Sequence, residues 1–245
     1  MKRDSNAYTF IFATLMVLVV ASALAFTASS LKDLQASNVR KEKMQNILAT
    51  IGVETDREQA EILYNQYITG ELSLTSGGDL DQEVNAFEIN LNNELKKPVN
   101  EQRFPLYEAS VEGEKYYIVP LRGAGLWNAI WGYIALESDR NTIKGAVFDH
   151  KAETAGLGAE ITQQWFMDRF VGEKVFDNDG KLVGISVSKT NNDPKDLDKN
   201  DHEVDAISGA TITGDGVSDM IIERLTHYQP YLEQTQTTTT VAANM

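Results

Sequence analysis

Thr211 is the residue whose chemistry stands out in this sequence, because of the residue types around it. It lies in the stretch Asp205–Thr213, which reads Asp, two residues, Ser, Gly-Ala-Thr, one residue and Thr. A threonine hydroxyl is a weak nucleophile that needs activation, and no built-in triad accompanies it here. Gly209 and Ala210 have almost no side chain, so the active site of another protein can approach the backbone closely. The pattern therefore predicts a hydroxyl that a separate enzyme modifies.

The same spacing matches the acceptor motif for a flavin bound through a phosphoester, with FMN on Thr211. A phosphodiester keeps a negative charge, and the start of a helix offers it free N–H groups and a favourable dipole. Ser208, Gly209, Ala210 and Thr213 are then expected to contact the cofactor. The alternative is that residues 208–214 form only a capping loop at the start of a helix.

An amphipathic helix is predicted directly after the motif. Its apolar face has helical spacing and consists of Val217, Met220, Ile221, Leu225 and Tyr228. Pro230 follows the last of these residues and predicts the end of the helix, because proline cannot donate the next hydrogen bond. The Thr-rich residues 231–245 are expected to be a disordered tail.

A second candidate cofactor loop is Glu153–Gly158, which follows a predicted strand. Its glycines let backbone N–H groups approach a ring edge or a phosphate. We expect contacts from Thr154, Leu157 and Gly158, with the Thr154 hydroxyl donating to an isoalloxazine carbonyl. An ordinary strand-to-helix turn is the alternative, and the two are compatible. Lys189 is a candidate to neutralise the flavin phosphate or the N1 region, although a surface lysine is the favoured explanation.

The glycines at 123 and 125 superficially resemble a nucleotide-binding loop. The third glycine of the dinucleotide fingerprint is missing, and a strand rather than a helix is predicted to follow. Taken alone, Gly123–Trp127 is better explained as a tight turn with a core tryptophan.

Composition excludes several functional classes. The chain has 245 residues, a formal charge of −14, no cysteine and three histidines. Without cysteine it cannot form a cysteine-ligated iron–sulfur cluster, a zinc–thiolate site or a thiol-linked flavin. The histidines show no ligand spacing, so no metal site is expected, and no basic patch indicates nucleic acid. No catalytic residue is assigned, because the predicted role is electron transfer.

The N-terminal segment predicts a membrane anchor. Residues 5–31 contain no charged side chain, and residues 8–28 as a helix would span about 31 Å, close to a bilayer core of about 30 Å. A cleaved signal peptide is the alternative, because Lys2 and Arg3 precede small-residue sites within 21–25. We favour a retained single-pass anchor that contacts lipid, because the uncharged run exceeds an ordinary signal sequence.

The remaining pattern predicts an α+β fold: one transmembrane helix, then a soluble FMN-binding domain with an antiparallel or mixed sheet flanked by helices. Helices are expected at 31–51, 57–68 and 163–170, and strands at 115–121, 129–137, 142–150 and 181–189. We divide the chain into an anchor (1–30), a helical and mixed region packing on the core (31–114), an FMN-binding domain (115–230) and the tail (231–245).

These motifs together resemble the C subunit of the Na+-translocating NADH:quinone oxidoreductase (Nqr) family. The similar segments are residues 38–48, Gly123–Trp127 with Gly132–Glu137, Glu153–Glu160 and Val204–Thr213. The paralogous G subunit of the Rnf complex shares the acceptor motif and the Gly-Leu-Gly loop, and the Gly-Leu-Trp stretch favours the former. Ala155 stands where this family usually has proline, which predicts a less rigid loop.

The resemblance implies one covalent FMN on Thr211, attached by a flavin transferase, in an electron-relaying subunit of a multi-subunit sodium pump. It also implies a bacterial inner-membrane protein with its domain in the periplasm. Charge favours the opposite orientation, because Lys32, Arg40, Lys41 and Lys43 follow the anchor and only Lys2 and Arg3 precede it. A non-redox extracytoplasmic binding module, with Thr211 as a helix cap, is the alternative from another functional class.

Overall fold

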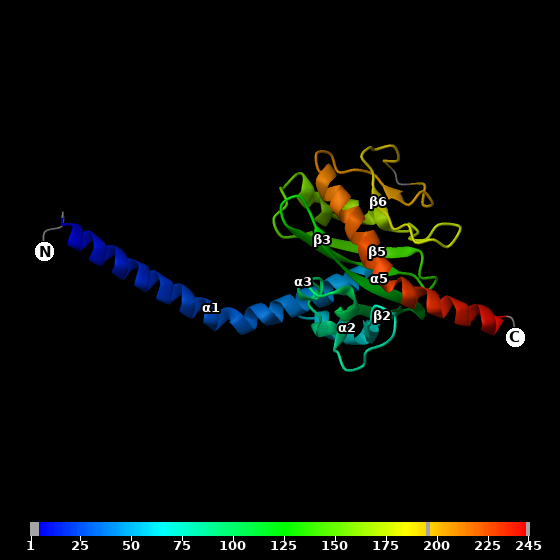
Figure 1. Ribbon diagram of the computed structural model, residues 1–245, viewed down its shortest axis with the longest axis horizontal. Coiled ribbons are helices and arrows are strands. Elements are labelled where there is room, and N and C mark those ends of the chain that lie inside the picture. Colours follow the sequence, from blue (N-terminus) through cyan, green and yellow to red (C-terminus); the bar gives the residue numbers. More distant parts are fainter. Residues whose placement is uncertain (1–4, 195–196, 244–245) are drawn as a thin grey trace. The chain divides into compact units, whose positions relative to one another are not determined.

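The computed structural model describes residues 5–194 and 197–243, and the side chains of its last helix as far as Glu233. The chain divides into two compact units, 1–43 and 44–245. The first unit is the larger part of one helix, α1 (Asn6–Thr50). Figure 1 shows the second unit as a twisted sheet with helices on it.

Helix α1 is continuous through both the predicted anchor and the predicted helix at 31–51. The expected break near residue 30 is absent, because residues 6–50 contain neither glycine nor proline. An 18-residue window of α1 has a mean hydropathy of 2.4 and is 0% buried, so the helix is long and apolar enough to cross a membrane. Gly52, with φ of 79°, ends it as the sequence predicts.

Five antiparallel strands form the main sheet in the order β1-β2-β3-β4-β5. Their bounds are β1 Ile68–Leu74, β2 Phe104–Val111, β3 Glu114–Ala124, β4 Ala129–Leu136 and β5 Ile143–His150. The α+β class is confirmed. The expected domain boundary at 114/115 falls within the β2–β3 hairpin, so the sheet itself joins the two regions that the sequence separated.

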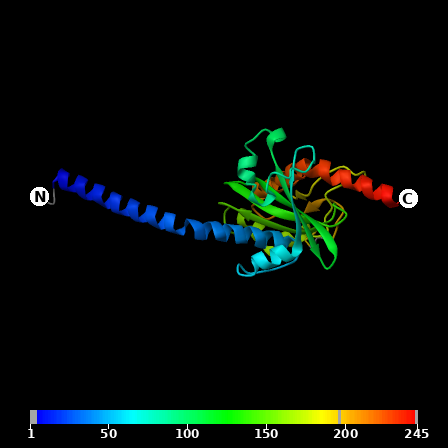
Figure 2. The same ribbon diagram turned by 90° about the horizontal axis from the view of Figure 1, so that it is seen from below.

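Both faces of the sheet are covered, as the alternation of β3 shows. Tyr117, Val119 and Leu121 belong to one apolar cluster and Tyr116 and Ile118 to the other, because successive side chains of a strand point to opposite faces. The second cluster includes residues from the end of α1 (44–50), Ile51 directly after it, and residues from α2 (Ala60–Tyr67). Figure 2 shows these helices on one side of the strands and α5 on the other.

Helix α5 (Thr211–Ala243) covers the first face. The predicted apolar face is confirmed: Val217, Met220, Ile221, Leu225 and Tyr228 are all buried. The predicted end at Pro230 is wrong, because α5 continues through this residue to Ala243. The disorder expected for 231–245 stays a prediction, and residues 244–245 lie outside the described part. The region around Pro230 is held by tertiary contacts, since Arg140 donates to the Leu232 carbonyl at 3.3 Å and Tyr228 to that of Pro105 at 2.8 Å.

Short elements connect β5 to α5. They are η3 (Gly158–Thr162), α4 (Gln164–Met167), η4 (Asp168–Phe170), β6 (Ser186–Val187) and β7 (Glu203–Val204), the last two forming a parallel pair. The helix expected at 163–170 is one α-helical turn, α4, followed directly by a 3-10 turn, η4. The strand expected at 181–189 is reduced to β6, because Gly184 takes φ of 69° and breaks the extended chain.

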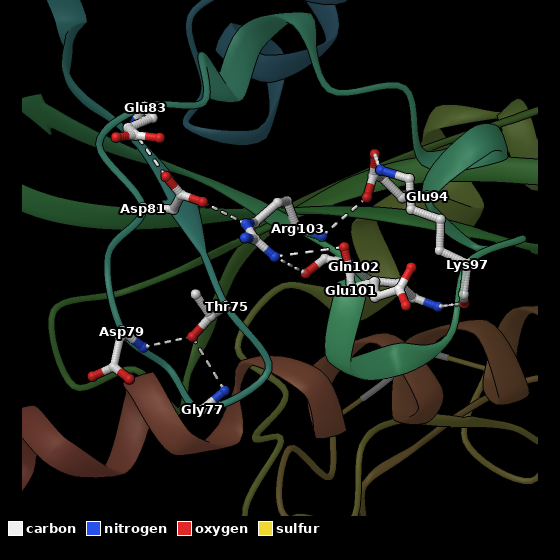
Figure 3. A network of polar contacts seen from close by, with 10 residues as sticks. All are labelled: Thr75, Gly77, Asp79, Asp81, Glu83, Glu94, Lys97, Glu101, Gln102 and Arg103. Carbon is white, nitrogen blue, oxygen red and sulfur yellow. Dashed lines mark hydrogen bonds and ion pairs between the residues drawn. The ribbon is translucent and has the colours of Figure 1, made fainter.

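The connection between β1 and β2 is a polar loop with short helical turns η1 (Ala86–Glu88), α3 (Leu91–Glu94) and η2 (Val99–Glu101). Arg103 holds it, donating through Nε to Asp81 at 2.6 Å and through its backbone N–H to Glu94 at 3.0 Å (Figure 3). The hydrogen bond from the Arg103 guanidinium, followed by that from the Glu83 N–H, lowers the pKa of Asp81. We call the set of Asp81, Glu83, Glu94, Lys97 and Arg103 the Arg103 network.

Candidate cofactor site

The acceptor turn, residues 207–213, leads into the start of α5. Ile207 and Ala210 are buried, and the Ala210 N–H donates to the Ile207 carbonyl at 3.0 Å, which closes the turn. Gly209 lies between them with φ of 74°, a left-handed conformation that glycine adopts without steric penalty. Thr211 is the first residue of α5, and its side chain is exposed. The turn therefore buries its small residues and leaves Thr211 open to solvent.

The start of α5 also supplies N–H groups. The Gly214 N–H donates to the Ala210 carbonyl at 2.9 Å. The N–H groups of Thr211, Ile212 and Thr213 precede this bond, so none of them has an acceptor four residues earlier within the helix. The positive end of the helix dipole lies at the same place. A negatively charged group attached to Thr211 would therefore meet favourable electrostatics.

Glu153 connects three segments beside the acceptor turn. Its Oε2 accepts a hydrogen bond from the Thr213 hydroxyl at 2.7 Å, and its Oε1 accepts one from the Trp127 backbone N–H at 3.0 Å. The residue is buried, with 7% of its surface exposed. Thus the loop after β5, the β3–β4 turn and the first turn of α5 meet at one carboxylate.

The Glu153 carboxyl is held in its charged form. Burial acts to raise its pKa, but the backbone N–H of Trp127, the Thr213 hydroxyl and the N–H groups of Asn128 and Leu126 together lower it below the ordinary value. Hydrogen bonds to a carboxylate favour ionisation in this way. The carboxylate therefore stays negative at neutral pH inside the protein.

Two glycines make room for this carboxylate. A Cβ at Gly158 would lie 2.5 Å from both Glu153 Oε2 and Thr213 Oγ1, and one at Gly125 would lie 2.6 Å from Glu153 Oε1. Real Cβ atoms do not approach neighbours so closely. Gly158 and Gly125 are thus needed for close approach to Glu153, which explains both glycine-containing loops.

The sequence and the fold are shared with known proteins. The family model described as the FMN-binding domain matches residues 125–226. The crystal structure of the C subunit of the Na(+)-translocating NADH-quinone reductase from Parabacteroides distasonis is 37% identical, with a TM-score of 0.74, over 83% of this chain and 97% of that one. The chain belongs to this C-subunit family.

Other members of the C-subunit family agree. The corresponding protein of Pseudomonas aeruginosa is 28% identical in an alignment of 239 positions, gaps included, and the match covers 89% of this chain and 91% of that protein. The crystal structure of the Shewanella oneidensis protein is 24% identical with a TM-score of 0.68, over 81% of this chain and 98% of that one, and supports the fold. The resemblance drawn from the motifs is confirmed.

The structure brings the residues predicted to contact the cofactor to one end of α5. The loop after β5 packs on the acceptor turn, since Leu157 Cδ2 lies 2.8 Å from the position of a Cβ on Gly209. Thr154 is exposed in the same loop, and its carbonyl accepts from the Leu157 N–H at 3.1 Å. Gly158 packs closely against the Thr213 side chain. Ser208 is exposed beside Gly209 in the turn itself.

Lys189 also reaches the first turns of α5. Its Nζ lies 3.8 Å from Asp215 Oδ2, and both side chains are largely exposed. Such a surface pair contributes little to stability. Lys189 can therefore turn toward an anion at the helix start at little cost, and its predicted role stays a prediction.

Arg169 is a residue near the site that the sequence did not indicate. It donates through Nη1 to the Asp205 carbonyl at 2.7 Å, and its guanidinium lies 5.0 Å from the ring centre of Trp165. Its partner is 36 residues away in sequence, and no local spacing reveals such a contact. Arg169 fixes the start of the acceptor motif and places a cation beside it.

Trp127 corrects one expectation. The alternative explanation of its turn required a core tryptophan, but the side chain is 66% exposed. The backbone of Trp127 is fixed by Glu153, and its ring is left on the surface beside an open cavity of about 500 Å³. Thr211 does not line this cavity, so we do not assign it as the flavin pocket.

Proposed function

We propose that this chain is the electron-transfer subunit of a Na+-translocating NADH:quinone oxidoreductase and carries FMN on Thr211 through a phosphoester. The observation that carries the proposal is the exposed Thr211 side chain at the start of α5, within residues that match an FMN-binding domain. Membership of the C-subunit family supports the same assignment. Bound FMN supplies reversible one- and two-electron chemistry.

Attachment requires a flavin transferase and flavin adenine dinucleotide. The Thr211 hydroxyl oxygen attacks the phosphorus that bears the riboflavin; this P–O bond forms, the pyrophosphate P–O bond breaks, and adenosine monophosphate leaves. The hydroxyl proton passes to a base of the transferase, because no base in the described part of this chain is bonded to Thr211. The small residues Gly209 and Ala210 leave space for that enzyme.

The neighbouring residues fit such a cofactor. The N–H groups at the start of α5 and Lys189 would stabilise the phosphate, with Ser208 as a further hydroxyl donor. The Thr154 hydroxyl is assigned to a carbonyl of the isoalloxazine ring. Leu157 is 41% exposed and offers an apolar surface to the ring, and Gly158 lets that loop approach α5.

Detection of the attached flavin tests this proposal. Full-length protein from the native membrane should fluoresce as a flavoprotein band after denaturing electrophoresis, and the peptide containing Thr211 should carry the mass of FMN. Thr211→Val should abolish the band, and Thr211→Ser should keep it. Thr226→Val removes an exposed threonine of the same helix and serves as the control. An unmodified wild-type peptide would instead support the non-redox module.

We also propose that residues 8–28 anchor the chain in the inner membrane with the domain in the periplasm. The support is the apolar part of α1 and family membership. The chain has no cysteine, so single cysteines report position cleanly. In intact cells an impermeant maleimide should label Glu114→Cys and not Ser5→Cys. The reverse result would place the domain in the cytoplasm, as the Lys and Arg count favours.

The Rnf-type G subunit remains the related alternative, with the same flavin chemistry. The Gly125-Leu126-Trp127 stretch and the relatives of the C-subunit family favour the Na+-translocating quinone reductase. Purification of the native complex with the partner subunits, followed by measurement of NADH:quinone activity with and without Na+, separates the two.

A further inference from the structure

The first turn of α5 lacks the local support that most helix starts have. The residue before Thr211 is Ala210, whose methyl group cannot accept a hydrogen bond from the first turn. The bond that holds this turn comes from outside the helix: the Thr213 hydroxyl donates to Glu153, 60 residues earlier in the chain. A tertiary contact to the Thr213 side chain therefore holds this turn in place, without using the backbone N–H groups that a capping side chain would bind.

The direction of Thr213 fixes the direction of Thr211. Successive residues of an α-helix are rotated by about 100°, so residues two apart point to nearly opposite sides. Thr213 is buried, with 1% of its surface exposed, and points to Glu153. Thr211 is exposed on the other side. Holding Thr213 inward therefore presents the Thr211 hydroxyl outward.

The carboxylate is itself fixed. The second oxygen of the carboxylate accepts a hydrogen bond from the Trp127 N–H, and the backbone N–H of Glu153 donates to His150 Nδ1 at 3.1 Å. In the part of the chain that the structure describes, the groups bonded to this carboxylate are neutral, so Glu153 is not one half of an ion pair there.

We propose that Glu153 is a positioning residue for flavin attachment, which holds the first turn of α5 so that the transferase meets the Thr211 hydroxyl in one orientation. This inference rests on the proposed attachment of FMN to Thr211. Glu153 does not touch the reacting atoms and acts through Thr213. The contact it makes is a hydrogen bond, so an amide that keeps the bond should keep the role.

The test is the attachment reaction itself, with full-length apo-protein in detergent, purified flavin transferase and flavin adenine dinucleotide. Glu153→Ala and Thr213→Val should lower kcat for attachment at least about tenfold, with KM for the protein changed less than about twofold. Glu153→Gln and Thr213→Ser should stay within about threefold of wild type. Glu94→Ala removes another carboxylate that accepts a backbone N–H, that of Arg103, and should react as wild type.

The outcomes separate the two proposals. If wild type is not modified on Thr211, the proposed function fails. If wild type is modified and Glu153→Ala reacts equally well or faster, the positioning role is overturned; Glu153→Gln behaving like Glu153→Ala would also overturn it, because charge rather than the bond would then matter. If near-ultraviolet circular dichroism shows that Glu153→Ala is unfolded, the Thr213 variants test the role instead. Slow attachment in Thr213→Val with near wild-type attachment in Thr213→Ser supports it, and equal attachment in both variants overturns it.

Discussion

Two polar clusters of this domain use carboxylates in different surroundings. Glu153 is buried and bonded to neutral groups from the β3–β4 turn and α5, whereas the Arg103 network joins charged side chains on the loop between β1 and β2 (Figure 3). In the network, water competes for the same charges, and surface ion pairs contribute little. At Glu153 no such competition exists, so loss of one partner leaves unsatisfied buried groups. The difference indicates that Glu153, with a single charge, contributes more to the free energy of unfolding than the ion pairs of the loop do.

The largest expected effect is that of Glu153→Ala on stability. The variant leaves the Trp127 N–H and the Thr213 hydroxyl without their acceptor, and it should lower the free energy of unfolding by about 3 kcal/mol. Glu94→Ala, which breaks the ion pair with Lys97 and removes the acceptor of the Arg103 N–H, should cost only about 1 kcal/mol, because both groups lie on a partly exposed loop. Urea unfolding of the full chain, followed by tryptophan fluorescence, measures both. Equal costs would remove the distinction between the two clusters.

Gly158→Ala should come next. Its Cβ would lie 2.5 Å from Glu153 Oε2 and Thr213 Oγ1, and such overpacking costs about 2 kcal/mol. Gly156→Ala is the matched control in the same loop: φ is 76°, but nothing lies within 4 Å of its Cβ position, so only backbone strain of about 1 kcal/mol is expected. If Gly156→Ala proves the more damaging, crowding around Glu153 is not what Gly158 relieves.

The distance along the sequence between interacting residues explains what the sequence could predict. The helix that follows the acceptor motif and the apolar face of α5 are local patterns, and the structure has both where the sequence predicts them. The cofactor contacts of the acceptor motif and of the loop after β5 stay predictions. Strands β1 and β2 were missed because β1 pairs with residues about 30 or more positions away, and their own residues have no clear alternation. The sequence did not indicate the role of Glu153 within its loop, because its partner in α5 lies 60 residues further on.

The smallest expected effect is the response to acid and salt, which separates the clusters by their exposure. Glu153 and Asp81 both have a lowered pKa. Each therefore stabilises the fold above the ordinary carboxyl pKa of about 4, and this contribution is lost as the pH falls through the lower folded-state value. Between about pH 6 and about pH 3, wild type should lose more stability than either Glu153→Gln or Asp81→Asn.

Salt then distinguishes the two carboxyls. At about 1 M ionic strength the Debye length falls to about 3 Å, so counterions weaken the charge attraction of the partly exposed Asp81–Arg103 pair. The buried hydrogen bonds of Glu153 join it to neutral groups and do not weaken in this way. In about 1 M NaCl, the stability that wild type loses between about pH 6 and about pH 3 should approach the loss of Asp81→Asn. It should stay larger than the loss of Glu153→Gln. Urea midpoints at both pH values measure this difference. Because each variant shares all other titrating groups with wild type, their contributions cancel. A Glu153→Gln difference that disappears in salt would mean that solvent reaches this carboxylate.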